Sequence, residues 1–206
     1  HHMLHFLENH DEQRIASPEF AGNAEKAKPA MLVSACLSSA PTMIYFGQEV
    51  GEPGAENAGF GQSSRTSIFD YIGVPHHQRW MNHGQFDGAL LSQSEQSLRS
   101  FYQTLLSLTL SESALTGQYH DLYAANYDNF TDMQHQLYAF ARSDKQQKLI
   151  VAANFSDTYS KDLDLIIPPA LIQDWQLSDG EYALFDKLNG RHHTLRVINQ
   201  QGLIAL

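Results

Sequence analysis

The order of apolar and polar residues gives the first half of the chain an alternating character. Residues 4–7 and 42–46 are short apolar runs of strand length. Between them, residues 30–39 are good helix formers that Pro29 introduces and Pro41 ends. A strand, a helix and a second strand joined in this way predict a βαβ unit, whose two strands are parallel.

Two further segments of this half have clear patterns. Residues 94–110 carry apolar side chains at helical spacing and predict an amphipathic helix that packs on a core. The apolar positions of this stripe are Leu98, Phe101, Tyr102, Leu105 and Leu108. Residues 47–61, rich in Gly, Pro, Asn and Glu, predict a long loop, and loops of this length are usually functional.

From about Tyr119 the pattern changes to short apolar segments separated by turn residues. In residues 162–167 the alternation has a period of two, with apolar residues at 163, 165 and 167. The predicted strands are 136–142, 149–155, 162–167, 181–185, 194–198 and 203–206. Their regular spacing predicts an antiparallel β-sandwich. We therefore predict an α/β domain over residues 1–118 and an all-β domain over residues 119–206.

Composition narrows the classes of partner. The formal net charge of −10 argues against a nucleic-acid partner, and no apolar run approaches the roughly 20 residues of a membrane-spanning helix.

The single cysteine, Cys36, excludes an internal disulfide. It lies in an apolar stretch, which predicts a buried thiol. His1, His2 and Met3 look like a tag or boundary remnant, so a native signal peptide would not be visible and localisation stays unknown.

Polar clusters follow both predicted strands of the first half. They contain Glu8, Asn9, His10, Asp11 and Arg14 after the first strand, and Gln48 and Glu49 after the second. Residues 6–11, with Arg14 three residues further on, resemble the fourth sequence region of the α-amylase family of glycoside hydrolases (family 13). Residues 40–51 resemble the last barrel strand of the same family. The resemblance covers nearly the whole chain, but only the C-terminal half of the family.

This resemblance implies a fold and an activity. The fold would be the last two βα units of a TIM-type (β/α)8 barrel, followed by an antiparallel β-sandwich. Retaining glycosidases use two carboxyl groups about 5–5.5 Å apart, and in this family they lie on earlier barrel strands. Asp11 matches a third carboxylate, the transition-state stabiliser, and His10 matches its sugar-binding neighbour. No segment matches the nucleophile or the acid/base, so the chain is expected to be an inactive fragment of a retaining α-glycosidase.

Other residues of the clusters have less defined roles. Asn9 and Arg14 are expected to bind substrate with His10, although Arg14 could equally be the ion-pair partner of a nearby acid. Glu8, Gln48 and Glu49 are expected to support the site, and a purely structural role for Gln48 and Glu49 is equally compatible with the sequence. The aromatic candidates for sugar stacking are Trp80, Trp175, Tyr119, Tyr123 and Tyr127.

The chain itself is expected to hold no metal or other cofactor. Adjacent histidines at 76–77 and 192–193 give poor ligand geometry and are expected in exposed loops. Calcium would fit the part of the family's barrel that lies outside this chain.

The expected substrate is an α-glucan, either an oligosaccharide or a polysaccharide such as starch. A non-catalytic carbohydrate-binding or interaction module built on the sandwich is the alternative, and an α-glucan transglycosylase or α-1,6-glucosidase is the alternative within the enzyme class. Two parallel strands leave unpaired edges, so the first half should pair with the missing part of the barrel or another chain, or be poorly ordered.

Overall fold

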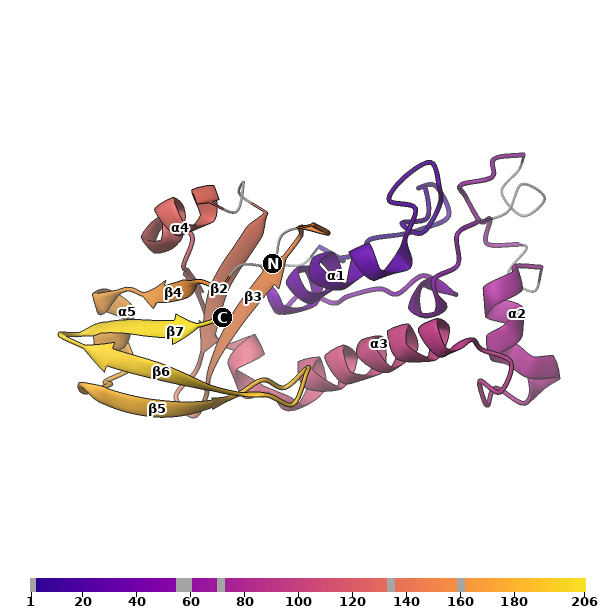
Figure 1. The fold of residues 1–206 in the computed structure, drawn as a ribbon. Coiled ribbons are helices and arrows are strands. Elements are labelled where there is room, and N and C mark those ends of the chain that lie inside the picture. Colours follow the sequence, from indigo (N-terminus) through magenta and orange to yellow (C-terminus); the bar gives the residue numbers. More distant parts are fainter. Residues whose placement is uncertain (1–2, 55–60, 70–72, 133–135, 159–161) are drawn as a thin grey trace. The chain divides into compact units, whose positions relative to one another are not determined.

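The computed structural model describes residues 3–54, 61–69, 73–132, 136–158 and 162–206 (Figure 1). Internal packing divides the chain into two units. The first unit contains His1–Ala35 and Ala40–Ser107, and the second contains Cys36–Ser39 and Leu108–Leu206. The chain therefore passes into the second unit, returns to the first, and crosses again near residue 107.

Helices and long connections make up the first unit. Its elements in chain order are η1 (Ala24–Lys26), α1 (Ala27–Cys36), η2 (Gln48–Val50), α2 (Pro75–Met81), η4 (Asn82–Gly84) and α3 (Gln93–Ser111), with the ends of α1 and α3 counted in the second unit. In the described part of the chain, no helix is long and apolar enough to cross a membrane.

The two predicted strands of the first unit are not formed along their length. In the described residues, 4–7 and 42–46 meet at one isolated parallel bridge between His5 and Thr42. The His5 N–H donates to Pro41 O at 2.9 Å, and the Met43 N–H donates to His5 O at 2.8 Å. The parallel direction agrees with the prediction. Two short segments without further neighbours are too little for a stable ladder, which explains why pairing stops at the bridge.

The predicted helices are present with shifted ends. α1 begins at Ala27 rather than residue 30 because Asn23 caps the preceding turn, its Oδ1 accepting the Glu25 N–H at 2.9 Å. α3 confirms the helix predicted over 94–110. It starts with a capping box, in which Glu95 N–H donates to Ser92 Oγ and Ser92 N–H donates to Glu95 Oε2.

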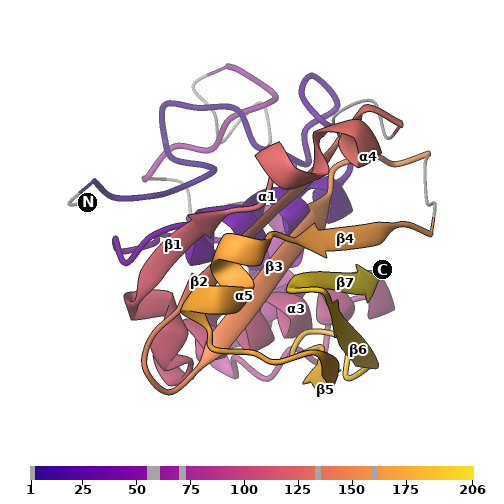
Figure 2. The same ribbon diagram turned by 90° about the vertical axis from the view of Figure 1, so that its left-hand side faces the viewer.

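The second unit contains two antiparallel sheets, which confirms the prediction for this half (Figure 2). The first sheet has the order β1-β2-β3, formed by Gln118–Asp121, Leu137–Ser143 and Lys148–Asn154. The second has the order β4-β7-β6-β5, formed by Asp164–Ile167, Gln201–Ala205, His192–Ile198 and Gly180–Phe185. The unit also contains two short α-helices, α4 (Tyr127–Asp132) and α5 (Pro169–Asp174), and two 3-10 helices, η5 (Ser113–Thr116) and η6 (Ala124–Asn126).

One hydrophobic core joins the two sheets and α5. Alternate residues of the strands enter it, among them Ala139 and Ala141 of β2 and Leu165 and Ile167 of β4. Trp175, which follows α5, is also part of this core and 6% exposed. The prediction that Trp175 could stack on sugars is therefore wrong, because its ring is packed inside the protein.

Arg142 holds the second unit together from the other face of β2. Its buried guanidinium donates to four main-chain carbonyls, those of Cys36 (3.3 Å), Leu37 (2.6 Å), Leu115 (2.7 Å) and Gly117 (2.9 Å). Cys36 is buried as predicted, and burial raises the pKa of its thiol to about 11. Arg142 thus fastens the short segment Cys36–Ser39 to the sheet.

Candidate functional site

A tight turn presents the two residues with the strongest functional prediction. The side-chain Oδ1 of Asn9 accepts the N–H groups of Asp11 at 2.8 Å and Glu12 at 2.9 Å, which forms an Asx turn. His10 and Asp11 stand at its tip, with side chains 51% and 75% exposed and 3.4 Å between His10 Nε2 and Asp11 Oδ2. The turn therefore places an imidazole beside a carboxylate in reach of a ligand.

An ion pair lies beneath this turn and closes its base. Arg14 Nη1 donates to Glu8 Oε2 at 2.8 Å, and both side chains are buried. The second oxygen of Glu8 accepts the Ile15 N–H at 2.7 Å. Burial raises the pKa of Glu8, and the neighbouring charge of Arg14 opposes that rise. The sequence left two roles open for Arg14, substrate binding and an ion pair with a nearby acid. The contact with Glu8 is such an ion pair.

The same guanidinium joins two more segments of the first unit. Arg14 Nη2 donates to Phe46 O at 2.7 Å, and Nε donates to Thr66 Oγ1 at 3.2 Å. The ring of Tyr45 packs 4.4 Å from the guanidinium carbon, and the Tyr45 hydroxyl donates to Thr66 O at 2.8 Å. We call Glu8, Arg14 and these contacts the arginine hub. It fixes the turn, the end of residues 42–46 and the segment around Thr66 to one another.

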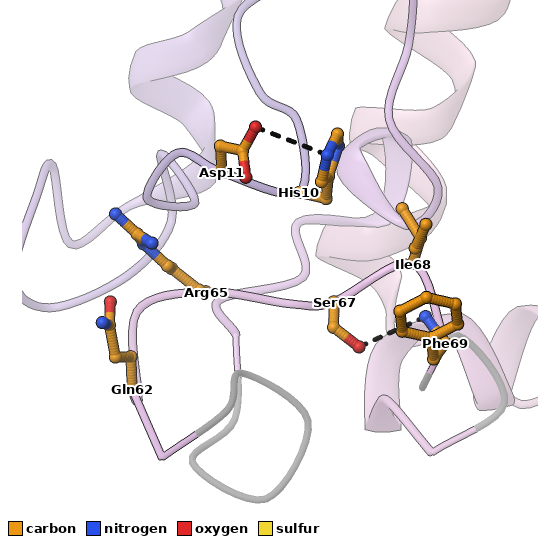
Figure 3. A pocket seen from close by; sticks show the side chains of 7 residues that line it. All are labelled: His10, Asp11, Gln62, Arg65, Ser67, Ile68 and Phe69. Carbon is orange, nitrogen blue, oxygen red and sulfur yellow. Dashed lines mark hydrogen bonds and ion pairs between the residues drawn. The ribbon is translucent and has the colours of Figure 1, made fainter.

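A pocket of about 320 Å³ opens beside His10 and Asp11 (Figure 3). Its other lining residues are Gln62, Arg65, Ser67, Ile68 and Phe69. Sequence reasoning assigned no role to these residues. Two signals in the sequence could have identified them. One is the preceding long loop over residues 47–61, and the other is the apolar pair at 68–69 within a polar segment. Residues 55–60 of the loop lie outside the described residues.

Gln48 and Glu49, the other predicted support residues, do not line this pocket. Gln48 is buried: its Nε2 donates to the Tyr102 hydroxyl at 3.1 Å, and its Oε1 accepts the Tyr45 N–H at 3.2 Å. These contacts tie η2 to α3. Glu49, the middle residue of η2, is half-buried.

The predicted histidine pairs lie in regular structure and not in exposed loops. His76 and His77 belong to α2, which Pro75 initiates, and their N–H groups donate to Glu52 Oε2 at 2.9 and 3.3 Å. His76 Nδ1 also lies 2.8 Å from Glu95 Oε1. His192 and His193 belong to β6. Among the described residues there is no group of three or more His, Cys, Asp or Glu side chains that could hold a metal ion.

Comparisons with known proteins show a resemblance to the C-terminal part of α-amylases. The family described as "Alpha amylase, C-terminal all-beta domain" matches residues 127–202. Among solved structures, a noncanonic maltogenic α-amylase, AmyB, from Thermotoga neapolitana is similar in fold, with a TM-score of 0.60 and 14% sequence identity. The likeness covers 98% of this chain and 38% of that chain. No curated protein sequence gives a significant match.

Proposed function

We propose that this chain is the C-terminal part of a retaining α-glycosidase that acts on α-glucans such as starch and maltooligosaccharides. The observation that carries the proposal is the exposed His10–Asp11 pair at the edge of a pocket. The motifs at 6–11 and 40–51 and the resemblance to the C-terminal part of α-amylases support it. The nucleophile and the acid/base would come from the part of the protein that precedes this chain.

Asp11 would act through differential binding and not through proton transfer. A carboxylate that accepts hydrogen bonds from ring hydroxyls stabilises the oxocarbenium-like transition state when those bonds strengthen as the ring flattens. Each hydrogen bond to a charged group contributes about 1.5–3 kcal/mol, so two such bonds supply about 3–6 kcal/mol. His10 would bind a neighbouring hydroxyl of the same sugar.

Asn9 and Arg14 would be positioning residues in this site. The Oδ1 of Asn9 holds the turn, and the guanidinium of Arg14 is buried in the arginine hub. Neither Asn9 nor Arg14 lines the pocket. The sequence predicted that both residues contact the substrate. In our proposal they instead hold the His10–Asp11 turn in position. Glu8 would support the site through Arg14.

The finer assignment of the first unit follows from the same proposal. Residues 4–7 and 42–46, with α1 between them, would be the last two strands of a (β/α)8 barrel. Their parallel bridge at His5 and Thr42 supports this assignment. Neighbouring strands supplied by the rest of the barrel would extend the pairing beyond the bridge.

The test uses the complete gene product that carries this sequence. Asp11→Asn should lower kcat/KM on maltooligosaccharides by at least about 100-fold, with an unchanged circular dichroism spectrum, because the amide binds hydroxyls without the charge. Glu12→Gln is the matched control, since Glu12 is an exposed acid next to Asp11 that does not line the pocket. Near-normal activity of Asp11→Asn would refute the proposal. Product chromatography with α-1,4- and α-1,6-linked substrates would separate hydrolysis from transglycosylation and identify the linkage.

A further inference from the structure

We propose that Glu52 and His77 form a pH-sensitive latch on the arginine hub, which holds the hub in place while the His77 imidazole is neutral and loosens it when the imidazole is protonated. This inference goes beyond the proposed function, because it concerns how the first unit responds to acid and not what the unit binds. It starts from two buried polar atoms, one on each residue, that have no hydrogen-bond partner among the described residues.

The latch packs against Phe46, one of the residues that the hub binds. The rings of His77 and Phe46 meet edge to face, with 5.5 Å between their centres. Gly47 follows with φ +79°, and a Cβ there would lie 3.0 Å from Glu52 Cβ and 3.5 Å from His77 Cβ. The bare glycine thus lets both side chains approach the main chain directly after Phe46. Because Phe46 O accepts the guanidinium of Arg14 at 2.7 Å, a movement of this segment reaches the hub.

The carboxylate of Glu52 uses only one of its oxygens. Glu52 is 1% exposed, and its Oε2 accepts the main-chain N–H groups of His76 and His77 at the start of α2. The first N–H groups of a helix have no partner inside it, so this oxygen satisfies two of them. Oε1 is buried and has no donor in the described part of the chain. A buried carboxylate oxygen without a donor is uncommon, and it can accept a new one.

His77 has the complementary deficit. Its ring is half-buried, and Nδ1 is buried without a hydrogen-bond partner among the residues that the structure describes. Protonation would place a charged N–H where it has no acceptor, which is costly. A rotated His77 side chain could donate this N–H to Glu52 Oε1, and the rotation would take its ring away from Phe46. The two atoms therefore define a second arrangement, which protonation favours.

The charges around the imidazole determine the direction of the pH dependence. Burial lowers the pKa of His77, Glu49 and Glu52 oppose this effect, and Arg14 adds to it. The folded state therefore binds the proton less tightly than a state in which the ring is released. The stability contributed by the neutral imidazole is complete above about pH 6.5, the ordinary pKa of His. It is lost as the pH falls from there toward the folded-state pKa.

The experiment measures main-chain hydrogen exchange by mass spectrometry in the complete gene product, in peptides that cover residues 8–14 and 45–52. Exchange rates at about pH 7.5 and about pH 5.5 are corrected for their intrinsic pH dependence. A released His77 has at least its ordinary pKa of about 6.5, so protonation favours the released state by about tenfold between these pH values. We expect protection of both peptides to fall at least about threefold in the unsubstituted protein and less than about twofold in His77→Gln.

Two further variants complete the comparison. His83→Asn is the matched control, because His83 is an exposed histidine of the first unit and Asn tolerates its positive φ. This variant should keep the full acid-induced fall in protection. Glu52→Gln should show a smaller fall, because the protonated imidazole then loses its charged acceptor.

The pKa of His77 can also be measured without a substitution, from the exchange of its ring C–H, and it should lie below about 6.5. A pKa at or above that value would overturn the inference. An acid-induced fall in His77→Gln or Glu52→Gln as large as in the unsubstituted protein would also overturn it. None of these measurements uses a substrate. Their failure would therefore leave the proposed function standing, and near-normal activity of Asp11→Asn would leave the latch standing.

Discussion

Replacing Arg14 with Met tests whether the arginine hub organises the site. Met keeps most of the side-chain length but removes the charge and all five donors. Glu8 then stays buried and keeps the hydrogen bond from the Ile15 N–H, and Phe46 O loses the hydrogen bond from Arg14 Nη2. Removing one partner of a buried ion pair typically costs about 3–5 kcal/mol. We expect Arg14→Met to destabilise the first unit by that amount.

A double-mutant cycle with Glu8→Leu separates charge pairing from packing. Each single variant leaves an uncompensated buried charge, so the two single costs sum to about 6–10 kcal/mol. The double variant leaves no buried charge and mainly loses two hydrogen bonds, the one from Ile15 N–H and the one to Phe46 O, at about 0.5–1.5 kcal/mol each. The double variant should therefore be less destabilised than the sum of the single variants by several kcal/mol.

The chain offers a specific reporter for this measurement. Trp80 lies in α2 of the first unit and Trp175 lies in the core of the second. In a Trp175→Phe background, urea unfolding followed by tryptophan fluorescence reports the surroundings of Trp80, where Arg99 packs 3.6 Å from the ring centre. A cost below about 1 kcal/mol for Arg14→Met, or strictly additive costs in the cycle, would refute the role of the hub.

The pH dependence gives an independent check of the same variant. Burial raises the pKa of Glu8 in spite of Arg14, so loss of Arg14 should raise it further. The folded state then binds this proton more tightly than the unfolded state does. The stability of Arg14→Met should therefore fall as the pH rises from about 4.3, the ordinary pKa of Glu, through the folded-state pKa. Glu8→Leu/Arg14→Met should not show this fall.

Two more predictions concern contacts outside the hub. A Cβ at Gly117 would lie 2.1 Å from Ser143 O, so Gly117→Ala should cost at least about 3 kcal/mol, measured by urea unfolding through Trp175 in a Trp80→Phe background. Gly190→Ala, which meets no atom within 4 Å but has φ +70°, is the control and should cost about 1–2 kcal/mol. Burial of Glu95 is outweighed by hydrogen bonds from Arg79 and Ser92, which lower the pKa of Glu95. The stability that the ionised Glu95 contributes is therefore lost as the pH falls below about 4.3. Glu95→Gln should lose less stability in acid than the unsubstituted protein, measured by urea unfolding through Trp80. The same loss in both proteins would contradict this.

The second unit was largely predictable because its strands carry their own pattern. The alternation at 163–167 places Leu165 and Ile167 in the core, as expected for a strand with one buried face. β1 was missed because Gln118–Asp121 lacks such a pattern and becomes a strand through its pairing with β2. α5, which lies between the predicted strands 162–167 and 181–185, was not predicted, although a proline is favourable in the first turn of a helix and α5 begins at Pro169.

In the first unit, the sequence located the candidate site without its internal arrangement. The polar cluster at 8–14 was visible in the sequence, but not which of its side chains turn inward. That division depends on Phe46 and Thr66, which are distant in sequence and provide the partners of Arg14. The pocket wall at Ile68 and Phe69 was missed for the same reason, because only the folded chain brings it beside Asp11.

Arg142 has a practical consequence for dissecting this protein. All four carbonyls that bind its guanidinium precede residue 119, where the change in sequence pattern suggests a cut. A recombinant β-module starting at Tyr119 would thus lose every carbonyl that binds Arg142, together with the segments that cover this face of β2, and it should express poorly or precipitate. A usable excised module would have to start upstream of Leu115, with the tetrapeptide Cys36–Ser39 supplied in trans or grafted on.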